Sequence, residues 1–262
     1  MNKTLLQEII KKDYQAIQSK IVRFLENEVS ERQSSGFIFG LSGGIDSAVI
    51  ASLCAVSLKE KSLALLMPDS KVTPQTDTED ALKIVDRFGF DYKLIDINLI
   101  HSEYSKYIEP NSLALGNLRA RIRSNILYYY ANSKNLLVLG SSDKSEYLIG
   151  YFTKFGDGAS DLLPIVSLYK TQIREFAKFL GLPDSIISKK SSPNLWHGHT
   201  AEDEIGFSYE EIDLVLYCMT EKNLSLQETA DLAQVDLSVV DKIHKLYKKS
   251  EHKRITATCC QL

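Results

Sequence analysis

Short apolar runs alternate with amphipathic stretches through the first 140 residues of the chain. Four runs have the length of buried strands, at residues 37–41, 63–67, 92–97 and 136–140. Between them, apolar positions recur at helical spacing in residues 47–59, near 77–88 and in 118–133. Strands separated by helices imply right-handed crossovers. The pattern therefore predicts an α/β fold with a doubly wound parallel sheet of the Rossmann-like type.

The pattern on either side of this region is mainly helical. Apolar positions predict one helix over residues 4–29, an amphipathic helix over 169–180 and three short helices from 209 to about 249. Residues 188–206 are polar and irregular, which is typical of a functional or mobile loop. We expect one domain over residues 1–262, with a core at 1–187, a mobile loop at 188–206 and a small C-terminal helical region with a tail at 207–262.

Composition excludes several classes of protein. The 262 residues are 44% hydrophobic and carry a net charge of −3, which leaves no general basic surface for nucleic acid. Residues 225–247 resemble a helix-turn-helix, but the second helix offers few side chains that could read bases, so a helical cap is favoured. No apolar stretch approaches the roughly 20 residues that span a membrane. The four cysteines lack metal spacing, and a cytoplasmic protein with reduced thiols is expected.

The segment Gly40-Leu41-Ser42-Gly43-Gly44-Ile45-Asp46-Ser47 stands between a predicted strand and a predicted helix. A turn there points the first N–H groups of the helix outward, in the positive end of its dipole. Gly43 and Gly44 lack side chains that would keep an anion away, and Ser42 and Ser47 add hydroxyl donors. The segment predicts a phosphate site. An ordinary glycine turn with a capping aspartate is the alternative.

A carboxylate at Asp46 would repel phosphate unless a divalent cation lay between them. Glu146 follows the fourth predicted strand at the same edge of the sheet, so Asp46 and Glu146 are the predicted Mg²⁺ pair. An ordinary exposed helix residue is the alternative for Glu146. The chain has no Gly-Lys pair and no Gly-x-Gly-x-x-Gly, which excludes a Walker A loop and the dinucleotide fingerprint.

Three other segments combine charge with glycine or aromatic residues. Residues 151–161 place aromatics beside Lys154, Asp157 and Asp161, which suits a planar charged ligand or a turn with buried rings. Residues 116–123 carry three arginines at a helix start, which suits phosphates or a solvated face. Residues 250–254 form a late charged cluster, which is a substrate segment or a solvated tail.

Together these segments resemble the ammonia-dependent NAD synthetases, a family of N-type ATP pyrophosphatases. The loop Ser-Gly-Gly-x-Asp-Ser is shared with GMP synthetases and tRNA-thiolating enzymes. Three blocks are more specific to the family: Gly116-Asn117-x-x-Ala120-Arg121-x-Arg123, Gly150-x-Phe152-Thr153-Lys154-Phe155-Gly156-Asp157-Gly158 with Asp161-Leu162-Leu163-Pro164, and Ser250-Glu251-His252-Lys253-Arg254. They occur in the family's order between Gly40 and Arg254.

The resemblance implies a set of site residues. ATP would bind Gly40, Leu41, Ser42, Gly43, Gly44, Ile45, Asp46, Ser47, Ser141, Lys170 and Ser192, and Mg²⁺ would bind Asp46 and Glu146. Deamido-NAD would bind Arg121, Lys154, Asp161, His252 and Lys253, and the catalytic residues would be Asp157, Lys170 and Lys154. Ser191-Ser192-Pro193-Asn194-Leu195 departs from the family's usual Pro-[Ser/Thr]-Ala-[Asp/Glu]-Leu, and Ser141 stands where a threonine is usual.

The activity that the resemblance implies is ATP-dependent amidation of deamido-NAD with ammonia, giving NAD, AMP and pyrophosphate through an acyl-adenylate, the last step of NAD biosynthesis. The implied partners are these small molecules, and a homodimer is expected by analogy. The 262 residues leave no room for a second full catalytic domain, so free ammonia is the expected nitrogen donor unless a separate amidotransferase docks. The alternatives are another ATP pyrophosphatase, GMP-synthetase-like or tRNA-modifying, and a non-catalytic nucleotide-sensing regulator.

Overall fold

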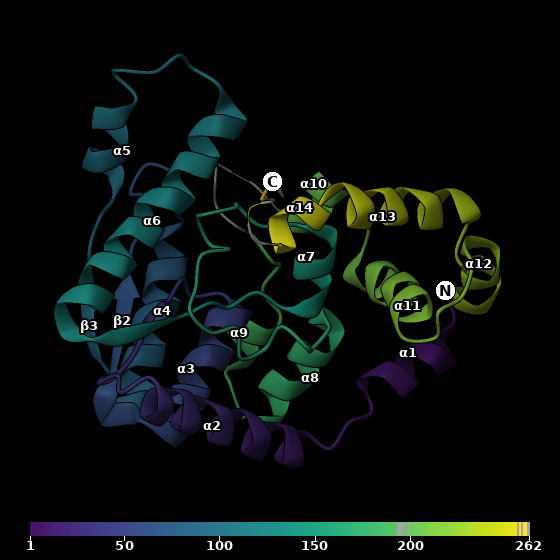
Figure 1. The fold of residues 1–262 in the computed structure, drawn as a ribbon, viewed down its shortest axis with the longest axis horizontal. Helices are drawn as coiled ribbons and strands as arrows, with labels where there is room; N and C mark the ends of the chain where they lie inside the picture. Colours follow the sequence, from purple (N-terminus) through teal and green to yellow (C-terminus); the bar gives the residue numbers. More distant parts are fainter. Residues whose placement is uncertain (193–195, 197, 199, 256, 258, 261–262) are drawn as a thin grey trace.

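A four-stranded parallel sheet stands at the centre of the α/β part of the fold (Figure 1). The computed structural model describes residues 1–192, 196, 198, 200–255, 257 and 259–260. The strands are β1 (Gly36–Gly40), β2 (Ser62–Leu66), β3 (Asp91–Leu94) and β4 (Leu136–Leu139), in the order β3-β2-β1-β4. The register pairs Phe39 with both Ala64 and Leu139. The chain adds β2 and then β3 on one side of β1, and it crosses back to add β4 on the other side. The topological switch point therefore lies between β1 and β4, and ligands bind at such points in doubly wound sheets.

Neighbouring residues of a strand point to opposite faces of the sheet. Both faces carry apolar side chains here, and helices cover both. Phe37 and Phe39 pack into one core and Ile38 into the other. The first face carries α2 (Tyr14–Glu31), α3 (Ile45–Ser57), α4 (Gln75–Phe88), α8 (Lys170–Phe179) and α9 (Asp184–Ile187). The second face carries α6 (Ser112–Lys134), with α5 (Asn98–Tyr104) beside it. The predicted doubly wound fold is confirmed.

The C-terminal helices form a separate apolar core beside the sheet (Figure 1). Its helices are α7 (Lys144–Ile149), α10 (Ala201–Ile205), α11 (Tyr209–Thr220), α12 (Leu226–Ala233) and α13 (Leu237–Lys249), followed by α14 (Glu251–Arg254). Tyr209, Leu216 and Val240 are among its fully buried members. The three helices predicted after residue 209 are confirmed as α11, α12 and α13.

The prediction of one helix over residues 4–29 is wrong. The chain forms α1 (Lys3–Ile10), breaks, and resumes as α2 after Asp13, whose carboxylate accepts a hydrogen bond from the Ala16 N–H at 2.9 Å. This side-chain cap begins a new helix where the apolar spacing lapses after Ile10. The break sends the two helices to different cores, because α1 packs on α11 and α8 while α2 packs on α3 (Figure 1).

Smaller differences also separate the predicted and observed elements. α6 begins at Ser112, before the predicted 118, because Asn111 caps it by accepting from the Ala114 N–H at 2.9 Å. α5 and the 3₁₀ turn η1 (Lys59–Lys61) have no counterpart among the predictions. Within the 188–206 loop, α10 is helical, whereas Pro193, Asn194, Leu195, His197 and His199 lie outside the described residues. Among the described helices, none combines the length and apolar character needed to cross a membrane.

Candidate active site

A cavity of about 690 Å³ opens where β1 and β4 end. The phosphate loop, residues 40–47, forms one wall, and residues 150–157 form another. α4, α6, the described part of the 188–206 loop and Lys253 complete the lining. Most of the predicted ATP residues line this cavity, namely Gly40, Leu41, Ser42, Gly44, Ile45, Asp46, Ser47, Ser141 and Ser192. The sequence therefore located the principal wall of the cavity.

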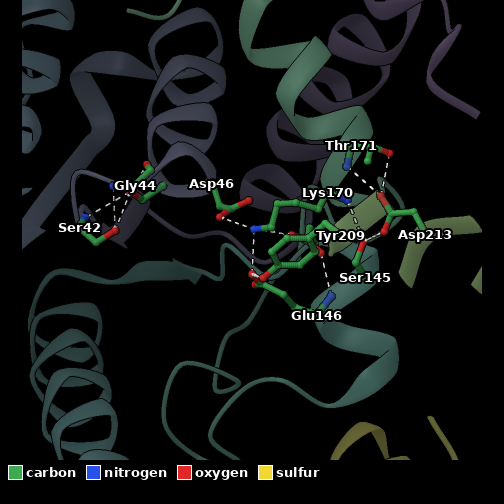
Figure 2. A network of polar contacts seen from close by, with 11 residues as sticks. Ser42, Gly44, Asp46, Ser145, Glu146, Lys170, Thr171, Tyr209 and Asp213 are labelled. Carbon is green, nitrogen blue, oxygen red and sulfur yellow. Dashed lines mark hydrogen bonds and ion pairs between the residues drawn. The ribbon is translucent and has the colours of Figure 1, made fainter. Parts of the chain in front are cut away.

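Hydrogen bonds within the phosphate loop hold it at the start of α3. The Ser47 hydroxyl donates to the Gly44 carbonyl at 3.0 Å and accepts from the Ser42 N–H at 3.2 Å. The Ser42 hydroxyl lies 3.1 Å from that of Ser47 and accepts from the Gly44 N–H at 3.3 Å (Figure 2). Gly44 is the N-cap of α3 and carries no capping side chain. The helix start thus faces the cavity with its first N–H groups, a geometry that suits an anion.

Gly43 lies against α4. Its φ of +81° is in the left-handed region, and a Cβ there would stand 2.1 Å from the Asp77 carbonyl oxygen. Lys189 closes the same contact from the 188–206 loop, since its ammonium donates to the Gly43 carbonyl at 3.1 Å and to Asp77 at 3.0 Å. Only glycine combines this conformation with this approach. Sequence reasoning missed Lys189, which has no local pattern around it.

The centre of charge is Lys170, the first residue of α8, which is fully buried. Its ammonium lies 2.8 Å from Asp46, 2.7 Å from Asp143 and 2.8 Å from Glu146 (Figure 2). Asp46 comes from the start of α3, and Asp143 and Glu146 come from the start of α7. Burial opposes the charge on Lys170, but the attraction of the carboxylates holds its pKa well above the usual range.

This cluster has more negative than positive charge, because three carboxylates surround one ammonium. Burial raises the pKa values of Asp46 and Asp143, and repulsion from Glu146 raises them further. The Asp46 Oδ1 atom is buried and accepts no hydrogen bond from the described residues. Oxygen ligands with a formal excess of two negative charges fit a divalent cation such as Mg²⁺. The predicted pair, Asp46 and Glu146, is thus brought together with a third carboxylate.

Two members of the cluster were not found by sequence reasoning. Asp143 also caps α7 by accepting from the Glu146 N–H at 2.9 Å, and a carboxylate three residues before a second one is a capping signal that could have found it. Tyr209 donates from its hydroxyl to Glu146 at 2.7 Å, and its ring centre lies 5.1 Å from the Lys170 ammonium. Tyr209 reaches the site from 63 residues away, and no local pattern reveals it.

The second wall is held by the C-terminal tail. Lys253 donates to the carbonyls of Gly150 at 2.6 Å and Phe152 at 2.7 Å, and it lines the cavity. A Cβ on Gly150, which has φ +71°, would stand 2.1 Å from the Cβ of Ser250. The tail and residues 150–157 are therefore in close backbone contact.

Asp157 lies in this wall and opens into the cavity. Its carboxylate accepts from the Thr153 N–H at 2.9 Å. Asp157 is exposed as a whole residue, but the atoms packed around its carboxyl exclude water and raise its pKa, although the Thr153 hydrogen bond opposes the shift. A carboxylate with a raised pKa beside a cavity can accept a proton from a bound group.

The other predicted substrate residues lie outside the cavity lining. Arg121 donates to the Lys154 carbonyl at 3.3 Å, and the Lys154 ammonium donates to the His252 carbonyl at 2.6 Å, so these three residues stand together at an outer edge. Asp161 accepts from the Val138 N–H at 2.8 Å and from the Tyr128 hydroxyl at 3.4 Å, beside β4. Lys170 lies behind Asp46 and Glu146 and does not line the cavity.

The three arginines predicted at a helix start lie instead within α6, because the helix begins at Ser112, and they point to two sides of it. Arg119 and Arg123, four residues apart, share one face. Arg119 pairs with Asp69 at 2.6 Å, and Arg123 donates to the Met67 carbonyl at 2.9 Å and lines the cavity. Burial lowers the pKa of Arg123 to about 10, so the guanidinium remains charged near neutrality. Arg123 is therefore a positively charged residue of the cavity wall that the sequence analysis did not predict.

We predict that Gly43→Ala weakens binding of a triphosphate by about tenfold or more, because the Cβ must displace the Asp77 carbonyl and open the loop. Calorimetric titration with ATP measures the effect. Gly206→Ala is the matched control, since Gly206 also has a positive φ, +83°, but a Cβ there would meet no heavy atom of the described residues within 4 Å. Equal affinities in the two variants would contradict the prediction.

Known proteins are similar to this chain along most of its length. The sequence matches the family described as NAD synthase over residues 17–257. The NH(3)-dependent NAD(+) synthetase of Staphylothermus marinus is 46% identical, over 96% of this chain and 93% of its own length. That of Hyperthermus butylicus is 47% identical, over 95% of this chain and 91% of its own length.

Solved structures share the fold. The NH3-dependent NAD synthetase from Campylobacter jejuni, in complex with the nitrate ion, is 36% identical with a TM-score of 0.82, over 95% of this chain and 100% of that chain. The NMN synthetase from Francisella tularensis is 33% identical with a TM-score of 0.84, over 96% of this chain and 100% of that chain. With a family match across most of its length and relatives of this similarity, the chain belongs to the NAD synthase family.

Proposed function

We propose that this protein amidates deamido-NAD with ammonia at the expense of ATP, giving NAD, AMP and pyrophosphate. The observation that carries the proposal is one cavity that joins the phosphate loop and its carboxylates to Asp157 and Lys253. A single cavity of this kind can hold a nucleoside triphosphate and a second charged substrate in contact. The names of the curated relatives support the same reaction.

In the first step, the nicotinate carboxylate of deamido-NAD attacks the α-phosphorus of ATP. The bond to the bridging oxygen breaks, and pyrophosphate leaves with its electron pair into the phosphate loop. The N–H groups at the start of α3 meet the charge that develops on the leaving group. Ser141 lines the cavity beside this loop, and Ser192 lines it from the 188–206 loop. We propose that both hydroxyls contact ATP.

In the second step, ammonia attacks the acyl carbon and AMP leaves. AMP is a far better leaving group than oxide, which is why the acid is adenylated first. The attacking nitrogen loses a proton, and Asp157, with its raised pKa, is the group in the cavity that we propose accepts it. The proposed contacts of deamido-NAD remain Lys253, Lys154, Arg121, His252 and Asp161. Of these, Lys253 lines the cavity.

We further propose that Asp46 and Glu146 hold Mg²⁺, with Asp143 behind them. Mg²⁺ bound there would neutralise charge on the phosphate oxygens of ATP. Lys170 keeps the three carboxylates together from the protein side. In this arrangement Lys170 acts on ATP through the carboxylates that it pairs with.

Ammonia is the proposed nitrogen donor because the chain covers more than nine-tenths of relatives named NH(3)-dependent. The same chain covers 47% of a glutamine-dependent NAD+ synthetase from Acinetobacter baumannii, at 26% identity and a TM-score of 0.68.

The buried thiols of Cys54 and Cys218 suit a reducing compartment, which supports the predicted cytoplasmic location.

A homodimer is the proposed assembly. Large apolar side chains are exposed on β3, α5, α6 and the connection between α5 and α6. These elements lie together on one side of the fold (Figure 1). Leu99 is 80% exposed, Tyr107 78% and Tyr129 67%. Exposed apolar side chains on neighbouring elements are typical of interaction sites, and a second copy of the chain offers the same surface in return.

The function is tested by supplying ATP, Mg²⁺ and ammonium with one of three nitrogen acceptors: deamido-NAD, the corresponding acid of the mononucleotide, or xanthosine monophosphate, which reacts at a ring carbonyl. We expect AMP and pyrophosphate to form together with NAD when deamido-NAD is present. Preferred turnover of xanthosine monophosphate, or of the mononucleotide acid, would contradict the proposed substrate. Comparable activity of the pure protein with glutamine in place of ammonium would contradict the proposed donor.

The metal proposal predicts that Asp46→Asn lowers kcat/KM by roughly 100-fold or more, because a carboxylate facing the phosphates is lost. Activity measured against Mg²⁺ concentration, together with a melting curve, separates metal binding from folding. Asp86→Asn, an identical change at an exposed position of α4, is the control. Near-normal turnover of Asp46→Asn at saturating Mg²⁺ would remove Asp46 from the metal site.

The dimer proposal predicts that a double variant, Leu99→Asp with Tyr129→Asp, is monomeric at concentrations where the unchanged protein is dimeric. Two charges in an apolar interface lose solvation without gaining partners. Sedimentation velocity over a range of concentrations measures the change, and Phe24→Asp on α2 is the control for an exposed apolar residue elsewhere. A monomeric unchanged protein at every concentration would refute the dimer.

A further inference from the structure

α11 presents two buried polar side chains to the start of α8 (Figure 2). Tyr209 and Asp213 are four residues apart and therefore lie on one face of the helix. Both are fully buried, yet α11 belongs to the C-terminal helical core and not to the sheet that carries the phosphate loop. A buried carboxylate is costly unless hydrogen bonds satisfy it, so its partners indicate what it holds in place.

Asp213 accepts directly from one N–H group at the start of α8 and is linked to a second through the Ser145 hydroxyl. One carboxylate oxygen accepts from the Thr171 N–H at 2.9 Å and from the Thr171 hydroxyl at 2.7 Å. The other accepts a short hydrogen bond from the Ser145 hydroxyl, and that hydroxyl accepts from the Lys170 N–H at 2.8 Å. The backbone of Lys170 is thus held through one intervening hydroxyl, and a negative charge at a helix start is favourable.

The same contacts join the two helices that deliver the charged cluster. Ser145 is on α7 next to Glu146, and Thr171 is on α8 next to Lys170. Asp213 therefore sets the distance between the lysine and the carboxylates of α7. One turn before it on α11, Tyr209 donates to Glu146 at 2.7 Å, on the oxygen that lies 2.8 Å from the Lys170 ammonium.

We infer that Asp213 is a positioning residue of the reaction: it fixes Lys170 against α7 and thereby fixes Asp46 and Glu146 at the phosphate loop. The C-terminal helical region then takes part in shaping the ATP site through α11. The inference rests on the proposed function for its kinetic consequence. Burial raises the pKa of Asp213 to about 6 although the Ser145 and Thr171 hydrogen bonds oppose the shift, so the charge is present at pH 7.5.

The test is Asp213→Asn, which keeps the size of the side chain and removes its charge. At pH 7.5, we expect kcat for NAD formation to fall by about tenfold or more, with KM for deamido-NAD changed by less than about twofold. Calorimetric titration with ATP and Mg²⁺, without the second substrate, should show weaker binding by several-fold. A residue that only stabilises the fold would change the melting temperature without changing kcat or ATP affinity well below melting.

Val215→Ala is the matched control, because Val215 is a fully buried apolar residue two positions along the same helix. Asp213→Asn with the kcat and ATP affinity of Val215→Ala would overturn the inference. If Asp213→Asn does not fold, Thr171→Val removes one hydroxyl bond at nearly constant shape, and we expect a fall in kcat of about threefold. An unchanged kcat in that variant would also overturn it.

The proposed function can fail separately. If the unchanged protein makes no NAD, the proposed reaction is wrong, while the ATP affinities of the unchanged protein, Asp213→Asn and Val215→Ala still decide whether Asp213 positions the site. Weaker ATP binding confined to Asp213→Asn would support positioning in that case, and equal affinities would refute it.

Discussion

The structure depends most on the ion-pair cluster around Lys170. A fully buried ammonium lies within 2.8 Å of carboxylates from α3 and α7, so three helix starts meet at one point beside the ends of β1 and β4. Burying charge is unfavourable, and removal of one partner from a buried pair typically costs about 3–5 kcal/mol. The cluster persists because Lys170 pairs with three carboxylates at once, and because the surplus negative charge of Asp46 and Glu146 faces a cavity that can hold a cation.

This cluster explains why the sheet and its two apolar cores need the separate helical core beside them. The sheet and its helices place the phosphate loop and the ends of β1 and β4, but they do not supply the residues behind Lys170. Those come from the helical core through Tyr209 and Asp213 on α11. α1 strengthens the junction between the helical core and the sheet, because it packs on both α11 and α8. The site lies where the helical core meets the sheet and its helices, and neither part contains it alone.

The wall formed by residues 150–157 is held by contacts to its own backbone atoms. Gly150 permits the close approach of Ser250, and Lys253 is held by two carbonyls of the 150–152 turn. The C-terminal tail therefore fixes the segment that carries Asp157. Arg121, Lys154 and His252 form a separate group outside the cavity lining, linked by backbone carbonyls. A substrate that used both groups would extend from the cavity across its outer edge.

The sequence by itself determined the features set by neighbouring residues: the parallel doubly wound sheet, the glycine turn before α3, the three C-terminal helices and the family. Strand length, helical spacing and glycine turns are local properties, so they can be recognised from the order of residues. Tertiary structure alone decided that Lys170 pairs with Asp46 across 124 positions and that Asp213 supports it from α11. It also gave the arginines of α6 different partners. These outcomes depend on which distant surfaces bury each other, and the local pattern is nearly the same whether a side chain faces water, a carbonyl or a buried carboxylate.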